Sequence, residues 1–341
     1  MKKIISAILI LIYLTNFIHA RNRDVGKVDS LVKNAISQSE ESLYEAKFDE
    51  ARTIIKLSSY DSIKEFNIEH EILLTIQALR IEGYMNILYL LETDYNDNLE
   101  RLIKLFPEAL ELEDNSIKGS YFYALSRAYS SVGIIDSAKL YEEKALQIFL
   151  AEEDFHKIAE IQAYNISSLH NQLLREGKKH EILNLIPKYE KEIEFSAKYS
   201  KFTLAYNLRH LAQIYRRQTS NYNESLRLFE SSLFLREEIG FKPFIPASYS
   251  SLGDVYLKME NYDNAIEMYQ RSAELAKEVG FVRYESYPLL MIGDIYFGIG
   301  NFDVAMDYYK KALDIATNNE YVMGINTAVE KIGLVEGRLE K

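Results

Sequence analysis

The chain has 341 residues, of which 48% are hydrophobic, enough for a continuous core and too many for a fully disordered protein. Its formal net charge of −11 disfavours general binding to nucleic acid or to anionic lipid. It contains no cysteine, which excludes disulfides, thiol catalysis and cysteine-based zinc sites.

Residues 1–20 have the pattern of a secretory signal peptide. Two lysines precede an apolar run from Ile4 to Leu14, and Ile18-His19-Ala20 fits a cleavage site. The run is shorter than the roughly 20 residues of a membrane span, although an uncleaved anchor or a buried N-terminal helix is the alternative. We expect the mature chain, 21–341, to be exported, periplasmic or extracellular, with a net charge of −13 and no membrane span.

The remainder of the chain has the pattern of an all-α protein. Apolar residues recur at steps of three and four, and five prolines and 14 glycines are few for an all-β chain. Pro107 and Pro187 lie inside helical patterns, so each should break or kink its helix. In chain order the pattern predicts seven helix pairs and a last helix, at 28–58, 67–113, 117–150, 155–197, 201–238, 243–278, 283–317 and 321–340.

Three glycines, Gly253, Gly293 and Gly333, recur at a fixed interval of 40 residues. The segment Ser251-Leu-Gly-Asp-Val-Tyr256 aligns with Met291-Ile-Gly-Asp-Ile-Tyr296. A fixed period between 20 and 50 residues indicates a stacked repeat architecture. Glycine inside a helix costs about 1 kcal/mol relative to alanine, so something must offset that cost at each of these positions.

These positions resemble the tetratricopeptide repeat family. In that family the first helix has a small residue where the paired helix crosses closely, followed one turn later by a tyrosine. The second helix has an alanine followed one turn later by an aromatic residue. The matching residues here are Gly253, Tyr256, Ala265, Tyr269, Gly293, Tyr296, Ala305 and Tyr309, with Gly333 starting a third copy. The resemblance implies a right-handed α-solenoid of antiparallel helix pairs, an exported bacterial protein with longer repeats than the usual 34 residues.

We expect a single solenoid over 21–341, with divergent repeats at 28–115, middle repeats at 117–238 and the best-matching repeats at 243–317. The helix at 321–340 should cap the stack with a polar outer face. His170 occupies a small-residue position, so its helix pair should be splayed or shifted. The pair at 201–238 has one extra residue in its turn, at Thr219-Ser220.

The resemblance places the first helices along a concave groove that holds peptides. The non-core face of three of them carries tyrosine, arginine and amide side chains: Tyr123, Arg127, Tyr164, Asn171, Arg175, Tyr206, Arg209, Gln213, Arg216 and Arg217. In an acidic chain these arginines are a local basic exception that could hold a carboxylate or phosphate by forked hydrogen bonds. The alternative is that they pair with glutamates of neighbouring helices.

The sequence lacks a P-loop, a His-Glu-x-x-His and a Gly-x-Ser-x-Gly motif, and its six histidines lack metal-ligand spacing. We interpret His170, His180 and His210 as packing or surface residues, and we expect no catalytic residue, cofactor or metal. The predicted function is a non-enzymatic scaffold that binds a protein or peptide in its groove. A ligand- or peptide-sensing module and an accessory subunit of an envelope assembly are the alternatives, and the oligomeric state stays open.

Overall fold

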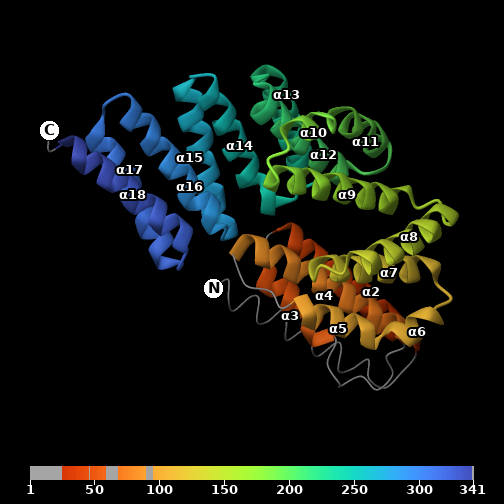
Figure 1. Ribbon diagram of the computed structural model, residues 1–341. Helices are drawn as coiled ribbons and strands as arrows, with labels where there is room; N and C mark the ends of the chain where they lie inside the picture. The colour runs from red at the N-terminus through yellow and green to blue at the C-terminus, as the bar shows by residue number, and fades with distance from the viewer. Residues whose placement is uncertain (1–24, 46, 59–67, 90–94, 340–341) are drawn as a thin grey trace. The chain divides into compact units, whose positions relative to one another are not determined.

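A computed structural model describes residues 25–45, 47–58, 68–89 and 95–339, and the regular elements in these ranges are all helices (Figure 1). The predicted all-α fold of antiparallel helix pairs is therefore confirmed. The chain divides at Ile158 into two compact units, apart from residues 88 and 89, which group with the second. A single solenoid over 21–341 stays a prediction, and the signal-peptide prediction lies outside the described residues.

The first unit consists of helix pairs near the predicted boundaries. The second helix of the middle pair ends at Lys104 and a new helix starts at Phe106, so the break expected at Pro107 is confirmed. The helices are α2 (Val25–Tyr44), α3 (Phe48–Ser58), α4 (Ile68–Tyr89), α5 (Tyr95–Lys104), α6 (Phe106–Leu110), α7 (Asn115–Ser131) and α8 (Ile135–Ala151).

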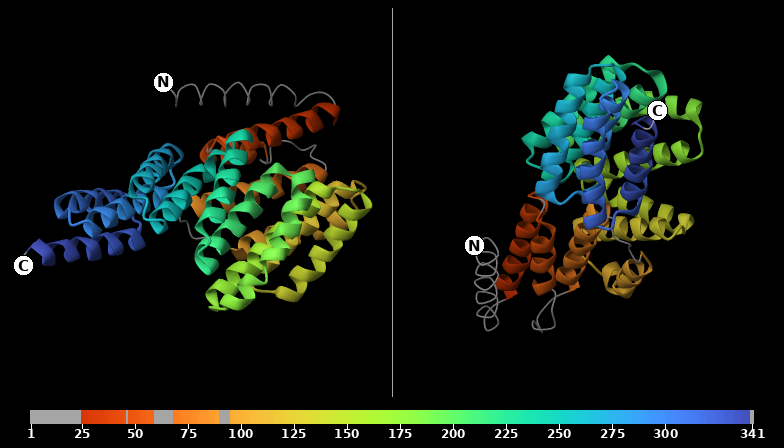
Figure 2. Two further views of the ribbon diagram at one scale, coloured as in Figure 1. Left: turned by 90° about the horizontal axis from the view of Figure 1, so that it is seen from above. Right: turned by 90° about the vertical axis from the view of Figure 1, so that its left-hand side faces the viewer.

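The second unit begins within α9, and from α12 to α18 each helix packs against the next along the chain (Figure 2). The break expected at Pro187 is confirmed, since α11 starts at Ile186. The helices are α9 (Phe155–Arg175), α10 (Lys179–Leu183), α11 (Ile186–Tyr199), α12 (Lys201–Ile214), α13 (Tyr222–Glu238), α14 (Ile245–Lys258), α15 (Tyr262–Val279), α16 (Val282–Gly298), α17 (Phe302–Asn318) and α18 (Val322–Leu339).

An asparagine starts each second helix of the last repeats. The side-chain oxygens of Asn221, Asn261 and Asn301 accept hydrogen bonds from the backbone N–H three residues later, at 3.3, 3.4 and 3.4 Å. Such a cap satisfies a donor that the first helical turn leaves unpaired. The asparagine therefore fixes where the second helix begins, one residue before its first aromatic side chain.

Two of the three repeating glycines lie directly beneath a tyrosine ring. A Cβ atom on Gly253 would lie 2.7 Å from Cδ1 of Tyr269, and a Cβ atom on Gly293 would meet the ring of Tyr309 in the same way. The two tyrosines are 0% and 2% exposed, so their rings fill the space that the missing side chains leave. The close approach expected at these glycines is therefore present.

The other repeat positions support the same crossing. Ala265 and Ala305 are 0% exposed, one turn before the tyrosines on α15 and α17. Tyr256 and Tyr296 are half-buried and pack against the adjoining hydrophobic cluster. The second helix thus contacts the first through a small residue and a ring in succession.

The prediction of a close approach at Gly333 is wrong. A Cβ atom on Gly333 would have no neighbour within 4 Å, and the same side of α18 exposes Val322, Met323, Val329 and Leu334. No helix within the described ranges packs on that side, where the exposed Asn326, Glu330 and Glu336 lie among these apolar side chains, so a polar capping face stays a prediction. The residue type repeats at this position, but its packing environment does not.

The extra residue near Thr219 lies at the end of a helix rather than in a turn. The backbone from Tyr215 to Thr219 forms a π-helix, and Ser220 follows in the left-handed region with φ of 56°. A π-helical turn accommodates one more residue than an α-turn and frequently occurs at functional sites. The side chains of Arg216 and Arg217 therefore point in other directions than they would on a continuous α-helix.

The glycine environments predict opposite effects for one kind of substitution. Gly253→Ala and Gly293→Ala should each lower the free energy of unfolding by about 1–2 kcal/mol, because overpacking against a buried ring exceeds the gain in helix propensity. Gly333→Ala should raise it by about 0.5–1 kcal/mol, because only the gain applies. Urea denaturation of the three variants measures this, and equal changes in all three would contradict the described packing.

Candidate functional site

The first helices of the second unit carry three arginines around the end of α12. Arg209 lies on α12, and Arg216 and Arg217 lie in the π-helix that follows it. Besides burial, the positive charges of Arg209 and Arg217 both lower the pKa of His170, so these two side chains lie near the same ring. We call Arg209, Arg216 and Arg217 the arginine cluster, and its local positive charge contrasts with the net charge of −11 of the chain.

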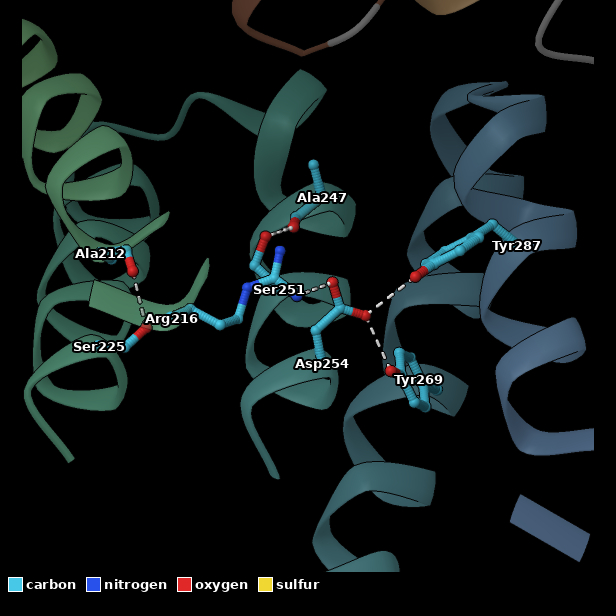
Figure 3. A network of polar contacts seen from close by, with 8 residues as sticks. All are labelled: Ala212, Arg216, Ser225, Ala247, Ser251, Asp254, Tyr269 and Tyr287. Carbon is cyan, nitrogen blue, oxygen red and sulfur yellow. Dashed lines mark hydrogen bonds and ion pairs between the residues drawn. The ribbon is translucent and has the colours of Figure 1, made fainter. Parts of the chain in front are cut away.

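Arg216 forms an ion pair with the first aspartate of the repeat. Its Nη1 lies 2.6 Å from Oδ2 of Asp254, and the two side chains are only 12% and 17% exposed. The other carboxylate oxygen accepts hydrogen bonds from the hydroxyls of Tyr269, at 2.8 Å, and Tyr287, at 3.1 Å (Figure 3). Asp254 therefore connects side chains from three successive helix pairs.

The two tyrosines remain neutral donors in this arrangement. Burial, followed by the negative charge of Asp254, raises the pKa of Tyr269 and of Tyr287 above the ordinary value. A hydroxyl that keeps its proton can donate to the carboxylate, whereas a phenolate would repel it. The geometry and the charges thus agree on a structural role for Asp254.

Asp294 repeats the arrangement with a different cation. It accepts a hydrogen bond from the hydroxyl of Tyr309 at 2.7 Å, and Nζ of Lys331 on α18 lies 2.6 and 2.8 Å from its two oxygens. Here the cation comes from the following helix, whereas Asp254 receives Arg216 from the preceding pair. In both repeats the aspartate joins the tyrosine of its own pair to a neighbouring pair.

The other two arginines of the cluster have no carboxylate partner within the described part of the chain. Arg209 is half-buried, donates to Nε2 of His210 at 2.8 Å and lies over the ring of Tyr206. Arg217 is exposed, yet loss of hydration beside the surrounding protein, and then the positive charge of Arg216, lower the pKa of its guanidinium. Pairing with a neighbouring carboxylate thus applies to Arg216 and not to Arg209 or Arg217.

A buried histidine pair lies beneath the arginine cluster. His170 and His210 are 1% and 2% exposed, with ring centroids 5.7 Å apart. The hydroxyl of Tyr189 lies 3.3 Å from Nδ1 of His170, and its ring stacks on that of His210. Because Nε2 of His210 accepts from Arg209, its Nδ1 carries the proton, and this atom has no hydrogen-bond partner.

The environment of this pair favours neutral imidazoles. Burial, followed by the positive charge of Arg209, lowers the pKa of His170 to about 4 and the pKa of His210 well below its ordinary value. His170 occupies the position that glycine has in the last repeats, and the ring of Tyr189 from α11 lies against it. A histidine–tyrosine contact thus replaces the glycine–tyrosine contact in this pair.

The remaining predicted site residues are distributed over both units. Tyr164 is half-buried on α9 and Gln213 half-buried on α12, whereas Asn171 and Arg175 are exposed on α9. The hydroxyl of Tyr206 donates to Oγ of Ser167 on α9 at 2.9 Å. These residues lie in the same unit as the arginine cluster.

Two predicted site residues belong to α7 of the first unit. Tyr123 is buried there and Arg127 is exposed. Each unit is described by itself, so the structure does not bring these two side chains together with the arginine cluster.

The predicted site residues did not include Asp254 or Tyr287. The recurrence of Asp254 at Asp294 was a usable signal, because a repeated polar residue beside a close helix crossing needs partners. Tyr287 gives no such signal, since Ala247 and Thr327 stand at the equivalent positions of the neighbouring repeats.

The sequence profile of the tetratricopeptide repeat matches residues 203–278 and 244–318, the region in which glycine, alanine and tyrosine make the helix crossings. Residues 203–318 are therefore similar to the tetratricopeptide repeat family. The matched residues run from within α12 to the end of α17 and include Arg209, Arg216 and Arg217. No curated protein matches the chain.

Several solved structures share the fold of this chain. NprR in complex with its cognate peptide NprX has a TM-score of 0.53 at 15% identity, over 96% of this chain and 93% of that one. A signal transduction ATPase (STAND) protein with a tetratricopeptide repeat sensor from Pyrococcus horikoshii has a TM-score of 0.56 at 16% identity, over 92% of this chain and 50% of that one. At these identities the similarity establishes the fold alone.

The histidine pair predicts that acid destabilises the second unit. An unfolded histidine titrates near 6.5, so between pH 6.5 and 4 the unfolded chain binds protons that the native chain does not. Stability should be complete above pH 6.5 and fall by roughly 1 kcal/mol per pH unit for each of His170 and His210 as the pH decreases.

Urea denaturation between pH 7 and 5 measures this slope. His170→Phe should reduce the slope by the contribution of one histidine, roughly 1 kcal/mol per pH unit. His180→Gln changes an exposed residue of α10 and should leave the slope unchanged. A slope that is the same in His170→Phe and in the unaltered protein would show that the buried imidazole does not control it.

Proposed function

We propose that the protein is a non-enzymatic scaffold that binds a polypeptide segment on the face of the first helices in its second unit. The arginine cluster recognises an acidic group of that segment. The observation that carries the proposal is that Arg217 is exposed and, within the described residues, has no ion-pair partner, although the chain has 51 acidic residues.

The chemistry of Arg217 favours an anionic ligand group. Its lowered pKa reflects lost hydration and the adjacent charge of Arg216, both of which a bound carboxylate would offset. A guanidinium can form two parallel hydrogen bonds with a carboxylate, which fixes orientation as well as charge. Arg216 is held by Asp254, so it adds positive potential without having to move.

The fold supports a polypeptide as the ligand. The solved structure of NprR, which shares this fold, holds its cognate peptide. An extended or helical peptide also suits a row of first helices better than a small molecule does, because successive repeats extend the row over many residues. Net negative charge elsewhere on the chain would restrict acidic segments to the arginine cluster.

Fluorescent decapeptides that end in Asp-Asp-Glu or in Asn-Asn-Gln test the proposal. The unaltered protein should bind the acidic peptide more tightly, and salt should weaken that preference. Arg217→Ala and Arg209→Ala should each weaken binding of the acidic peptide about tenfold, as loss of a charged hydrogen bond predicts. The matched control is Arg271→Ala, which removes an exposed arginine from a second helix, α15.

Equal affinity of the unaltered protein for the two peptides, or an equal effect of Arg271→Ala, would contradict recognition by the arginine cluster.

We also propose that the protein is exported after removal of residues 1–20, on the basis of their charged start and short apolar run. Within the described residues no helix has the length and apolar character of a membrane span. N-terminal sequencing of the protein from envelope fractions should give a chain that begins at Arg21. Recovery of the chain with Met1 intact would contradict cleavage.

A further inference from the structure

Asp254 lies near two arginines of the arginine cluster but forms an ion pair with only one of them. Nη1 of Arg216 lies 2.6 Å from Oδ2 of Asp254. Lost hydration and the charge of Arg216 lower the pKa of the Arg217 guanidinium, and the charge of Asp254 opposes them, so the carboxylate acts on both arginines. A carboxylate has about four acceptor positions on its two oxygens, enough for two guanidinium groups. The other donors around Asp254 therefore decide that Arg217 stays outside the pair.

Two tyrosine hydroxyls occupy the second oxygen of Asp254. Oδ1 accepts from the hydroxyl of Tyr269 on α15 at 2.8 Å and from the hydroxyl of Tyr287 on α16 at 3.1 Å (Figure 3). Each carboxylate oxygen has two lone pairs, so these two donors fill the acceptor positions of Oδ1. Only Oδ2 is then left for a cation, and Arg216 takes it.

Asp294 shows the same carboxylate with one tyrosine hydroxyl in place of two. Tyr309 donates to its Oδ1 at 2.7 Å, and Thr327 stands at the position equivalent to Tyr287. Nζ of Lys331 lies 2.6 Å from Oδ1 and 2.8 Å from Oδ2, so the cation contacts both oxygens. Where the second hydroxyl is missing, a cation thus takes a position on the oxygen that the hydroxyl would fill.

The two tyrosines of Asp254 differ in how they relate to the repeat. Tyr269 recurs as Tyr309, and both rings cover a glycine at the helix crossing. Tyr287 does not recur, since Ala247 and Thr327 stand at the equivalent positions. The repeat architecture therefore does not require the hydroxyl of Tyr287, and its contact with Asp254 is particular to the repeat beside the arginine cluster.

We propose that Tyr287 is a positioning residue of the arginine cluster: its hydroxyl fills Oδ1 of Asp254 and thereby keeps Arg217 available to the acidic group of the ligand. The inference rests on the proposed function for the identity of the ligand, but the effect of Tyr287 on Arg217 does not. Tyr287 acts through Asp254 and does not contact the ligand.

Tyr287→Phe removes the hydroxyl and keeps the ring, and a urea denaturation curve checks that the variant folds. Oδ1 of Asp254 then has an open acceptor position near Arg217, as Oδ1 of Asp294 has for Lys331. If Arg217 is paired in about four-fifths of the molecules, affinity for the decapeptide that ends in Asp-Asp-Glu should fall about fivefold.

Tyr296→Phe is the matched control. It removes a hydroxyl from a half-buried tyrosine of the same helix, whose ring stacks on Tyr308 and not beside Asp254. Affinity for the acidic peptide should stay unchanged in this variant. An equal loss in Tyr296→Phe and Tyr287→Phe would contradict a role that is specific to Tyr287.

Asp254→Asn tests whether Tyr287 acts through the carboxylate. An asparagine cannot form an ion pair with Arg217, so Tyr287→Phe should have no further effect on the affinity for the acidic peptide in this background. The same loss in both backgrounds would overturn the proposal, because it would mean that the hydroxyl contacts the peptide itself.

Modification by phenylglyoxal measures the state of Arg217 without any peptide. The reagent attacks accessible, unpaired guanidinium groups, and mass spectrometry of the digested protein locates the modified arginine. Arg217 should react about fivefold more slowly in Tyr287→Phe than in the unaltered protein, because the unpaired fraction falls by that factor. Tyr296→Phe should react at the unaltered rate.

The two measurements separate the proposal from the function on which it rests. Equal reaction rates at Arg217 in Tyr287→Phe and in the unaltered protein would overturn the proposal, whether or not the acidic peptide binds. Equal affinity of the unaltered protein for the acidic and the amide peptide would contradict the proposed function alone, and the reaction rates would still decide whether Tyr287 controls Arg217.

Discussion

The contact of a tyrosine ring with a glycine backbone holds successive helices of the last repeats together. At Gly253 and Gly293 the absent side chain leaves room for the ring of Tyr269 or Tyr309, which is then fully buried. The hydroxyl at the end of the same ring donates to an aspartate one residue after the glycine. One side chain thus supplies both apolar contact area and a directed polar bond.

This contact also determines which charges are available to a ligand. Because the tyrosines occupy one oxygen of Asp254, its other oxygen is directed toward Arg216, and the two charges satisfy each other in a partly buried pair. Arg217, the next residue in the π-helix, remains exposed beside them. The same bonds that align three helix pairs therefore hold one arginine in place and leave its neighbour accessible.

Much of the architecture followed from sequence because local rules determine it. Helical spacing located the helix pairs, Pro107 and Pro187 located the breaks, and the 40-residue period located the crossings. Local patterns could not show that Gly333 lacks a covering ring, since the residue is the same as in the covered repeats. The nearby Leu334, in place of an aspartate, was the readable difference.

The candidate site was less predictable than the fold. Arg216 and Asp254 are 38 residues apart, and the π-helix that sets the direction of Arg216 was visible only as an extra residue near Thr219. The sequence pattern predicted that Tyr123 would face the groove, yet its neighbours bury it. Side-chain partners across repeats depend on helix rotation, which spacing alone does not give.

A double-mutant cycle between Gly253 and Tyr269 tests the glycine–tyrosine contact most directly. If the ring is what excludes a side chain at position 253, Gly253→Ala should destabilise the unaltered protein but stabilise the Tyr269→Ala variant, in which the methyl group enters vacated space. The sign of the effect on the free energy of unfolding should therefore reverse. An equal loss of stability in both backgrounds would contradict the account, because it would place the requirement for glycine elsewhere than in the ring.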